Sequence, residues 1–191
     1  MGPFLVIRGS IVMSILVVIA CMALSGASTE ITPSPQVAEL QAATPSDQDA
    51  ACRVSHTFPA SILQWCGWIT EYAEANQLAP DLVASVMLME SGGDPMAYSR
   101  SGAVGLMQIM PRDGIAADFQ CINGPCFANR PSIAELQDPE FNIQYGTRML
   151  ARLYTRYLTW RDALKAYGPM DVEYSYADKV LGIYERNRTL E

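Results

Sequence analysis

The sequence predicts an all-α domain, and three observations support this fold class. Apolar residues recur every three or four positions in several segments, which is the spacing of helices that bury one side. Proline and acidic residues begin two of these segments, as they commonly do at helix starts. Between residues 52 and 191, no segment alternates apolar and polar residues as a half-buried strand would.

Residues 1–27 have the pattern of an export signal, which predicts that the protein works in the periplasm or cell envelope. Arg8 precedes an apolar run over residues 11–24 that is short for a membrane span, and small residues end the signal at Ala27. Cleavage after Ala27 is our first expectation. Two alternatives stay open: an uncleaved anchor, or acylation of Cys21, which follows Val-Ile-Ala as in a lipoprotein signal and would make the protein lipid-anchored.

Residues 28–51 are rich in Pro, Ser, Thr, Ala and Gln, which predicts a flexible leader ahead of one domain over residues 52–191. The chain has 191 residues and carries 13 Lys and Arg against 20 Asp and Glu, a formal net charge of −7. Nucleic-acid binders need a basic face, so this acidic chain is not expected to bind nucleic acid.

Four cysteines follow the signal, and an even number in an exported chain predicts two disulfides. Four cysteines allow three pairings. The turn residues between Cys121 and Cys126 favour a local bridge there, which leaves Cys52 to pair with Cys66. A zinc site is the alternative, but neither spacing is that of a zinc motif and the chain has one histidine, His56. We expect no metal and no organic cofactor.

Two helices are predicted in the first part of the domain. Residues 59–76 place apolar side chains on one side, and residues 80–90 begin with proline and an acidic residue. The pair Gly92 and Gly93 ends the second helix.

Glu90, at the end of the second helix, is the residue around which a site is expected. It lies seven residues after Val83 and four after Val86, so its carboxyl should point in the same direction as core-facing side chains. An apolar surround and the negative end of the helix dipole should both raise its pKa. Such a carboxyl keeps its proton near neutral pH, as a general acid must. The alternative is a partly exposed residue of a last helical turn.

Beyond Glu90, the sequence predicts a glycine-rich loop and then a second group of helices. Gly102 and Gly105 predict a tight loop that leads into a short helix closed by Pro111. Gln108 offers a donor and acceptors for the hydroxyl and acetamido groups of a sugar. Residues 112–130 are expected to be mostly loop.

Three helices are predicted at the end of the domain. Asp138, followed by proline and glutamate, starts a helix that runs to about Leu158. Two shorter helices are expected over residues 160–167 and 173–186, where apolar residues again recur at helical spacing.

The motifs around Glu90 closely resemble those of the SLT-type lytic transglycosylase domain, which has a goose-type lysozyme-like fold. The chain reads E-S-G-G-D-P from Glu90, A-x-S up to Ser99 and G-A-x-G-L-M-Q-I-M-P from Gly102 to Pro111. Residues 142–150 resemble the N-I-x-x-G-x-x-x-L helix of the family, which has a packing role. The resemblance implies an all-α, lysozyme-like domain with an active-site cleft.

This resemblance implies that the substrate is peptidoglycan and that Glu90 is the single acid/base. In the family, the acid protonates the oxygen of the β-1,4 bond between N-acetylmuramic acid and N-acetylglucosamine, and the muramoyl acetamido group assists. The same residue then takes the proton of the C6 hydroxyl, and a 1,6-anhydro ring closes. Most glycosidases use two carboxylates, but substrate-assisted enzymes are exceptions. Asp94 and Asp113 are the nearest candidates for a second carboxylate, and Asp94 also fits a turn or cap.

The resemblance also assigns five residues to substrate binding. Ser99 matches a serine that contacts the acetamido group, and Met107 and Gln108 match residues that line the sugar subsites. Tyr167 matches a tyrosine near the acid, and Tyr176 matches one that closes the cleft. Ordinary core packing is the alternative for Met107 and for both tyrosines.

One departure from the family pattern falls at the far end of the site. The family commonly has A-Y-N-x-G, whereas this chain has Ala-Tyr-Gly-Pro over residues 166–169 and a shortened connection to Tyr176. This change puts one polar contact to the sugar and the width of the cleft in question.

Two other functions stay open at this point. One is a lysozyme-type hydrolase, in which water captures the intermediate with the help of a carboxylate such as Asp94. The other is a scaffold that binds peptidoglycan without cleaving it. The size of the chain suggests service to a cell-envelope machine for secretion, conjugation or flagellar assembly.

Overall fold

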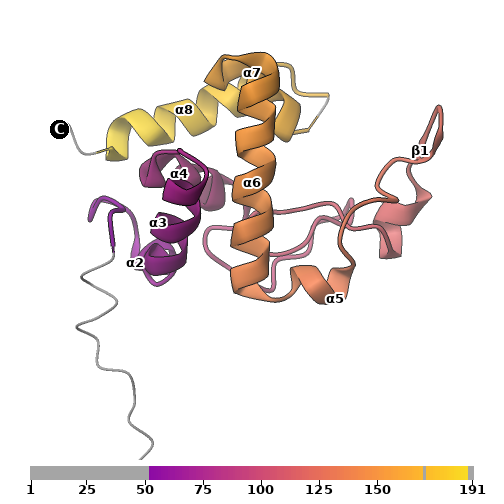
Figure 1. Ribbon diagram of the computed structural model, residues 1–191, viewed down its shortest axis with the longest axis horizontal. Coiled ribbons are helices and arrows are strands. Elements are labelled where there is room, and N and C mark those ends of the chain that lie inside the picture. Colours follow the sequence, from indigo (N-terminus) through magenta and orange to yellow (C-terminus); the bar gives the residue numbers. More distant parts are fainter. Residues whose placement is uncertain (1–51, 170, 189–191) are drawn as a thin grey trace, which may run out of the picture. The chain divides into compact units, whose positions relative to one another are not determined.

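Helices make up most of the structure, a computed structural model that describes residues 52–169 and 171–188 (Figure 1). The α-helices are α2 (Ala60–Leu63), α3 (Cys66–Ala75), α4 (Pro80–Glu90), α5 (Ile133–Leu136), α6 (Pro139–Tyr157), α7 (Trp160–Tyr167) and α8 (Ser175–Asn187). A 3-10 helix, Gly114–Asp118, and two short antiparallel strands, β1 (Gln120–Cys121) and β2 (Gly124–Pro125), lie between α4 and α5. The predicted all-α fold class is confirmed. The predicted signal, the leader and Cys21 lie outside the described residues.

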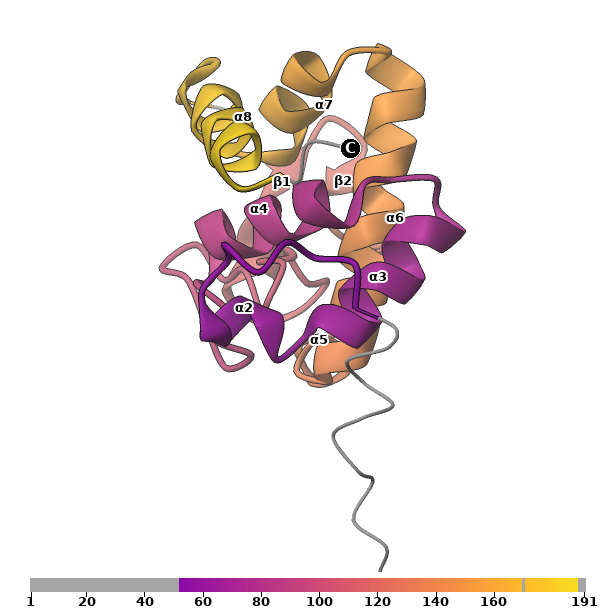
Figure 2. The same cartoon turned by 90° about the vertical axis from the view of Figure 1, so that its left-hand side faces the viewer.

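The longest helix, α6, begins and ends where the sequence predicted. The Oδ1 atom of Asp138 accepts a hydrogen bond from the backbone N–H of Phe141 at 2.7 Å, and proline occupies the first helical position. Leu158 ends the helix in the left-handed conformation, with φ 63°. α6 packs against α3, α5 and α7, while α8 packs against α4 and α7 (Figure 2).

The core surrounds α4, whose residues from Asp81 to Met87 are all buried. Gly146 of α6 allows the glycine-rich loop to approach this core closely. A Cβ atom on Gly146 would lie 2.6 Å from the Cβ of Met107, which is too short for two carbon atoms. The packing role expected for this part of α6 is therefore confirmed.

The single helix predicted over residues 59–76 is wrong, because the chain forms two helices there. Trp65 leaves the helical conformation, with φ −97° and ψ 4°, and its indole N–H donates to the carbonyl of Gly93 at 3.0 Å. Only Gln64 and Trp65 lie between α2 and α3, and this short break coincides with the contact from Trp65 to Gly93. Local helix propensity could not reveal this contact.

The short helix predicted before Pro111 is also wrong. Val104 and Ile109 exchange backbone hydrogen bonds of 3.0 and 3.1 Å, which closes a tight loop in place of a helix. Gly105 and Gln108 both adopt positive φ values, 75° and 45°, that an α-helix does not contain.

Both favoured disulfides are present, and residues 112–130 are mostly loop as predicted. Cys52 pairs with Cys66 across a Cα–Cα distance of 5.3 Å, and Cys121 pairs with Cys126 across 5.0 Å. The second bridge joins β1 to the turn after β2, at the hairpin that projects from the right of Figure 1. Because all four cysteines are bridged, the zinc alternative loses its thiolate ligands.

The last two helices are close to their predicted positions. α7 has the predicted bounds. α8 begins two residues later than expected, because Glu173 has a positive φ of 48° and cannot be the first helical residue.

Candidate active site

Glu90 is the last residue of α4, and its carboxyl is half-buried where α4 meets α8. The hydroxyl of Tyr176 in α8 donates a short hydrogen bond to Oε1 of Glu90. Burial raises the pKa of this carboxyl to about 7, and the hydrogen bond from Tyr176 opposes the rise. The expectation of a raised pKa is confirmed, with burial as its main cause.

Two tyrosines that the resemblance assigned to the site lie beside Glu90. Tyr176 is 5% exposed, and burial is the main reason why its pKa is raised. Tyr167 of α7 donates its hydroxyl to the carbonyl of Met107 at 2.8 Å. Burial and the charge of Glu90 hold its pKa well above the ordinary value, while Arg130 acts in the opposite direction. Both phenols therefore keep their protons and act as neutral donors near neutral pH.

The glycine-rich loop is held in place by Asn142, a buried residue of α6. Oδ1 of Asn142 accepts from the backbone N–H of Met107 at 2.8 Å. Its Nδ2 donates to the carbonyls of Val104 and Leu136 at 2.9 and 2.8 Å. A Cβ on Gly105 would lie 2.3 Å from Nδ2, so only glycine permits this contact. The amide of Asn142 thus joins the loop and the end of α5 to α6.

Ser91 ties the other side of this loop to α4. Its Oγ donates to the carbonyl of Leu106 at 2.8 Å and accepts from the backbone N–H of Gly93 at 3.1 Å. Helical periodicity and the motif spacing do not single out Ser91 or the role of Asn142. The available signal for both is position in the sequence. Ser91 directly follows the apolar helix α4, and Asn142 lies on the buried side of α6.

Three other residues expected to bind substrate are held in this loop. Ser99 is partly exposed, and its Oγ accepts from the backbone N–H of Ala103 at 2.8 Å. Gln108 donates its amide to the carbonyls of Ala97 and Gly105 at 3.1 and 3.0 Å, so it braces the loop. The Met107 side chain is fully buried, so the packing alternative fits it better than a contact with substrate.

Asp94 and Asp113, the candidates for a second carboxylate beside Glu90, both accept hydrogen bonds from backbone N–H groups. Oδ1 of Asp94 accepts from the N–H of Met96 at 2.9 Å, the turn role that the sequence allowed. Oδ1 of Asp113 accepts from the N–H of Ile133 at 2.8 Å. Within residues 52–169 and 171–188, only burial and Tyr176 shift the pKa of Glu90. Glu90 is therefore the carboxyl on which chemistry at this site would depend.

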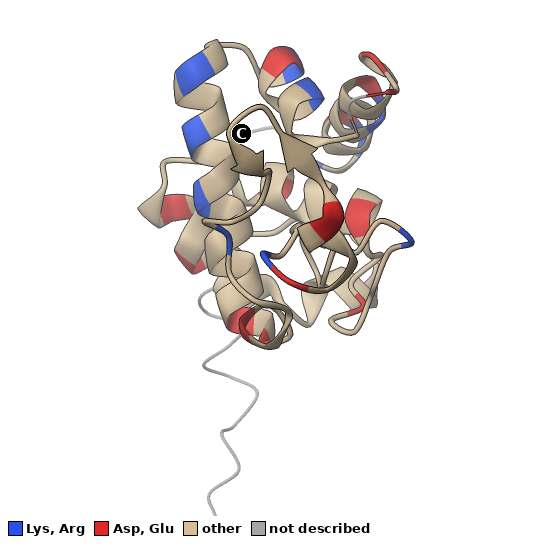
Figure 3. Cartoon of the chain, turned by 90° about the vertical axis from the view of Figure 1, so that its right-hand side faces the viewer, with Lys and Arg blue, Asp and Glu red and all other residues tan. Residues whose placement is uncertain are grey.

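Charge is unevenly distributed over the side of the domain that Figure 3 shows. Figure 3 shows basic residues along α6, whereas acidic residues are scattered over the other elements.

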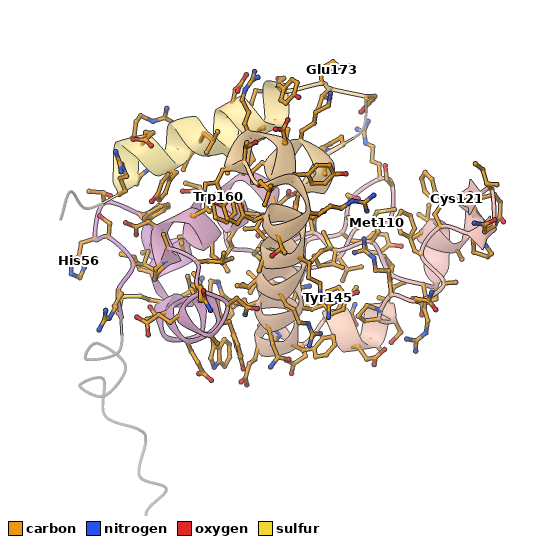
Figure 4. All side chains as sticks on the ribbon, turned by 45° about the horizontal axis from the view of Figure 1, so that its top comes forward. His56, Met110, Cys121, Tyr145, Trp160 and Glu173 are labelled. Atoms are coloured by element: carbon orange, nitrogen blue, oxygen red, sulfur yellow. A yellow bond between two sulfur atoms is a disulfide. The ribbon has the colours of Figure 1, made fainter. Side chains whose placement is uncertain are left out.

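His56 and Cys121 lie at opposite sides of the domain (Figure 4). In the part of the chain that the structure describes, no group of three or more His, Cys, Asp or Glu residues could hold a metal ion. The same residues include no helix long and apolar enough to cross a membrane.

A family model described as "Transglycosylase SLT domain" matches residues 67–172, which is more than half of the chain. The chain belongs to the SLT transglycosylase family. The match runs from α3 through α7 and includes Glu90, the glycine-rich loop, Asn142 and Tyr167.

Curated relatives of this SLT-family chain include two membrane-bound enzymes. It is 35% identical over 99 residues to a membrane-bound lytic murein transglycosylase E of Buchnera aphidicola, covering 52% of this chain and 43% of the relative. It is 35% identical over 91 residues to an endo-type membrane-bound lytic murein transglycosylase A of Citrobacter koseri, covering 48% and 43%. The chain thus spans less than half the length of the relatives it matches.

A solved structure of lytic transglycosylase Slt from Pseudomonas aeruginosa, an inactive mutant, is also similar to this SLT-family chain. The two share 21% sequence identity with a TM-score of 0.47. The match covers 61% of this chain and 22% of that protein.

Proposed function

We propose that this protein is a peptidoglycan lytic transglycosylase in which Glu90 is the acid and the base. One observation carries the proposal: Glu90 is a half-buried carboxyl whose pKa of about 7 lets it hold or release a proton near neutral pH. Membership of the SLT family and the names of its curated relatives support murein as the substrate class.

In the first step, protonated Glu90 gives its proton to the oxygen of the β-1,4 bond between N-acetylmuramic acid and N-acetylglucosamine. The bond from this oxygen to the anomeric carbon breaks, and the N-acetylglucosamine end leaves as an alcohol. The carbonyl oxygen of the muramoyl acetamido group attacks the anomeric carbon and carries the positive charge into an oxazolinium ring. The substrate thereby supplies the nucleophile, so a second carboxylate is not needed.

In the second step, the Glu90 carboxylate takes the proton of the muramoyl C6 hydroxyl. The C6 oxygen attacks the anomeric carbon, the acetamido oxygen leaves, and a 1,6-anhydro ring closes. Glu90 ends protonated, as it began, and no water is consumed. A group that is first an acid and then a base works best with a pKa close to the ambient pH, which fits a value of about 7.

Tyr176 balances the two protonation states of Glu90. Burial alone would favour the neutral carboxyl so strongly that proton release would be costly. The phenol hydrogen bond stabilises the carboxylate that forms in the first step, and the phenol itself stays neutral. Tyr167, bonded to the carbonyl of Met107, keeps the glycine-rich loop next to Glu90.

The remaining assignments stay predictions. Ser99 can still donate its hydroxyl hydrogen to a muramoyl acetamido group, because Oγ only accepts from Ala103 within the loop. Gln108 would contribute to sugar binding through its carbonyl oxygen, since its amide nitrogen serves the loop. Export to the periplasm or envelope and service to an envelope machine belong to the same proposal, with acylation of Cys21 as the alternative to cleavage after Ala27.

The experiment is mass spectrometry of the muropeptides that the mature protein releases from purified sacculi. A transglycosylase releases products with anhydro ends, lighter by one water than hydrolytic products. Glu90→Gln should lower the rate about 10²–10⁴-fold, the usual contribution of a general acid. Glu74→Gln, an exposed residue of α3, is the control and should cleave as the unmodified protein does.

Three other outcomes would contradict the proposal. Release of hydrated reducing ends, abolished by Glu90→Gln, would make the protein a lysozyme-type hydrolase. Binding to sacculi without release by either protein would identify a scaffold. Anhydro products formed equally fast by Glu90→Gln would remove Glu90 from the acid role.

A further inference from the structure

Gly168, directly after α7, lies against the ring of Tyr176. A Cβ atom on Gly168 would be 2.4 Å from Cδ1, 2.5 Å from Cγ and 3.0 Å from Cε1 of that ring. Carbon atoms in contact are normally about 3.5–4.0 Å apart. The ring therefore occupies the space that any other residue at this position would need for its side chain.

The backbone does not require glycine here. Gly168 has φ −74° and ψ −173°, an extended conformation that every residue type adopts. By contrast, Gly93 and Gly105 have φ values of 90° and 75°, where a side chain is strained whatever the space around it. What glycine provides at position 168 is room for the Tyr176 ring.

We propose that Gly168 is a positioning residue, because the missing side chain lets the Tyr176 ring lie where its hydroxyl reaches Glu90. The inference rests on the proposed function in taking Glu90 as the acid/base. Tyr176 is 5% exposed, so its ring has little space into which it could retreat. The crowded atoms include Cγ, which is close to the backbone of α8 and cannot swing aside as the tip of a flexible side chain can.

The position is also where this chain departs from the A-Y-N-x-G pattern of the family that it resembles. The departure puts one polar contact to the sugar and the width of the cleft in question. Here it has a second consequence, since an aromatic ring packs on the space left by the absent side chain. Gly168 and Tyr176 therefore form one unit, and neither should change without affecting the other.

Substitution of Gly168 should act on Glu90 only through Tyr176. The ionisable groups that face the Glu90 carboxyl are Tyr176 from α8 and Tyr167 from α7, and Arg130 acts on Tyr167. Displacing the ring breaks the hydrogen bond that favours the carboxylate, so the pKa of Glu90 should rise. Tyr176→Phe removes the same bond and keeps the ring.

The test is an NMR titration of the Glu90 side-chain carboxyl carbon, made without substrate. Gly168→Ala and Tyr176→Phe should each move the pKa of Glu90 upward by similar amounts, and the double variant should move it no further than Tyr176→Phe alone. Gly182→Ala in α8 is the matched control, because its Cβ would meet only the end of the Arg186 side chain, at 3.3 Å. An unchanged pKa in Gly168→Ala, or shifts that add in the double variant, would overturn the proposal.

Thermal unfolding provides a second test that holds even if Gly168→Ala folds poorly. Alanine at position 168 should lower the melting temperature when Tyr176 is present and leave it nearly unchanged in a Tyr176→Ala background, where the ring is gone. Equal losses in both backgrounds would contradict a steric role. Both measurements need no turnover, so they separate this inference from the proposed activity.

Activity adds a readout if the protein cleaves murein. Glu90 must be protonated at the start of the reaction, so kcat/KM should fall as pH rises through its pKa. Gly168→Ala should move this alkaline limb to higher pH together with Tyr176→Phe, which a general loss of folded protein would not do.

Discussion

Two neighbouring loop segments, residues 91–111 and 112–131, are held in place in different ways. The first segment carries the glycine-rich loop and is fixed by side chains from helices distant in the sequence. The second contains the hairpin, which its own disulfide closes. This difference shows which part of the domain must be rigid for Glu90 to keep its surroundings and which part can change without moving them.

Four side chains from outside or from the edge of the first segment bond to its backbone. They are Trp65 of α3's N-terminal cap, Ser91, Asn142 of α6 and Tyr167 of α7. Their partners are main-chain groups, so the contacts fix the path of the loop whatever its side chains are. The same loop carries Ser99 and Gln108, whose side chains bond to its backbone.

The second segment is joined to the rest of the domain mainly at its base. The N–H of Arg112 donates to the carbonyl of Pro131 at 2.9 Å and closes this base. Asp113 accepts from the N–H of Ile133, and Nη1 of Arg130 donates to the sulfur of Met149 in α6, both at 2.8 Å. At its tip, Ile122 is completely exposed, and Phe119 is 43% exposed. A segment with few buried contacts can open without unfolding the core.

The largest expected effect is the loss of Asn142 from the first segment. Asn142→Ala should lower the free energy of unfolding by about 3–5 kcal/mol, because it leaves a buried N–H and two buried carbonyls without a partner. Chemical denaturation measures the loss. Asn76→Ala is the control, because Asn76 makes one hydrogen bond to the carbonyl of Tyr72 at the end of α3, and should cost about 1 kcal/mol or less.

Equal losses for Asn142→Ala and Asn76→Ala would break the comparison. They would mean that the glycine-rich loop opens as easily as a helix end. Asn142→Asp sharpens the test, because it keeps the shape and the acceptor but turns the Nδ2 donor into an acceptor that faces two carbonyls. It should be at least as destabilising as Asn142→Ala.

An intermediate effect is expected from Glu90 itself, as a dependence of stability on pH. The folded protein keeps the Glu90 proton up to about pH 7, whereas a solvated glutamate releases it near 4.5. The folded state therefore binds more protons in this window, and its free energy of unfolding should fall as pH rises from 4.5 to about 7. Glu90→Gln lacks this fall and should gain up to roughly 3 kcal/mol over the unmodified protein across the window.

Denaturation of both proteins at about pH 5 and about pH 8 tests this prediction. The difference between the two proteins at each pH isolates Glu90 from every other titrating group. Glu71→Gln, which removes an exposed carboxyl of α3, is the control variant. If Glu90→Gln and the unmodified protein had the same free energy of unfolding at both pH values, burial would not hold the proton on this carboxyl.

The sequence allowed much of the site to be predicted, because local spacing and family motifs both point to Glu90. Its distance from Val83 and Val86 put the carboxyl on the buried side of a helix, and the structure bears this out with a raised pKa. The start of α6 at Asp138 was predicted for a similar reason, since cap and proline signals are local.

What the sequence could not predict depends on contacts between distant segments. The break before α3 lies where Trp65 bonds to Gly93, 28 positions away, and the tight loop before Pro111 is held by Asn142 of α6 and Tyr167 of α7. The three hydrogen bonds of Asn142 likewise reach residues that lie 6 to 38 positions away. Helix periodicity marks Asn142 as facing inward but says nothing of its partners.

The smallest expected effect lies in the second segment. The Cys121–Cys126 bridge closes a short loop, with a sequence separation of 5, whereas Cys52–Cys66 spans 14. From loop length alone, each bridge would contribute about 2 and about 3 kcal/mol respectively. If the second segment opens before the core unfolds, part of the contribution of the Cys121–Cys126 bridge does not appear in the free energy of global unfolding.

We therefore expect the double Cys→Ser variant at 121 and 126 to lose less than about 2 kcal/mol on global unfolding and to keep the pKa of Glu90. Hydrogen exchange should rise over residues 119–127 while the amide of Met107, bonded to Asn142, stays protected. The matched Cys→Ser pair at 52 and 66 should lose more stability. Loss of Met107 protection in the first variant would show that the hairpin supports the glycine-rich loop, and that the two segments are one cooperative unit.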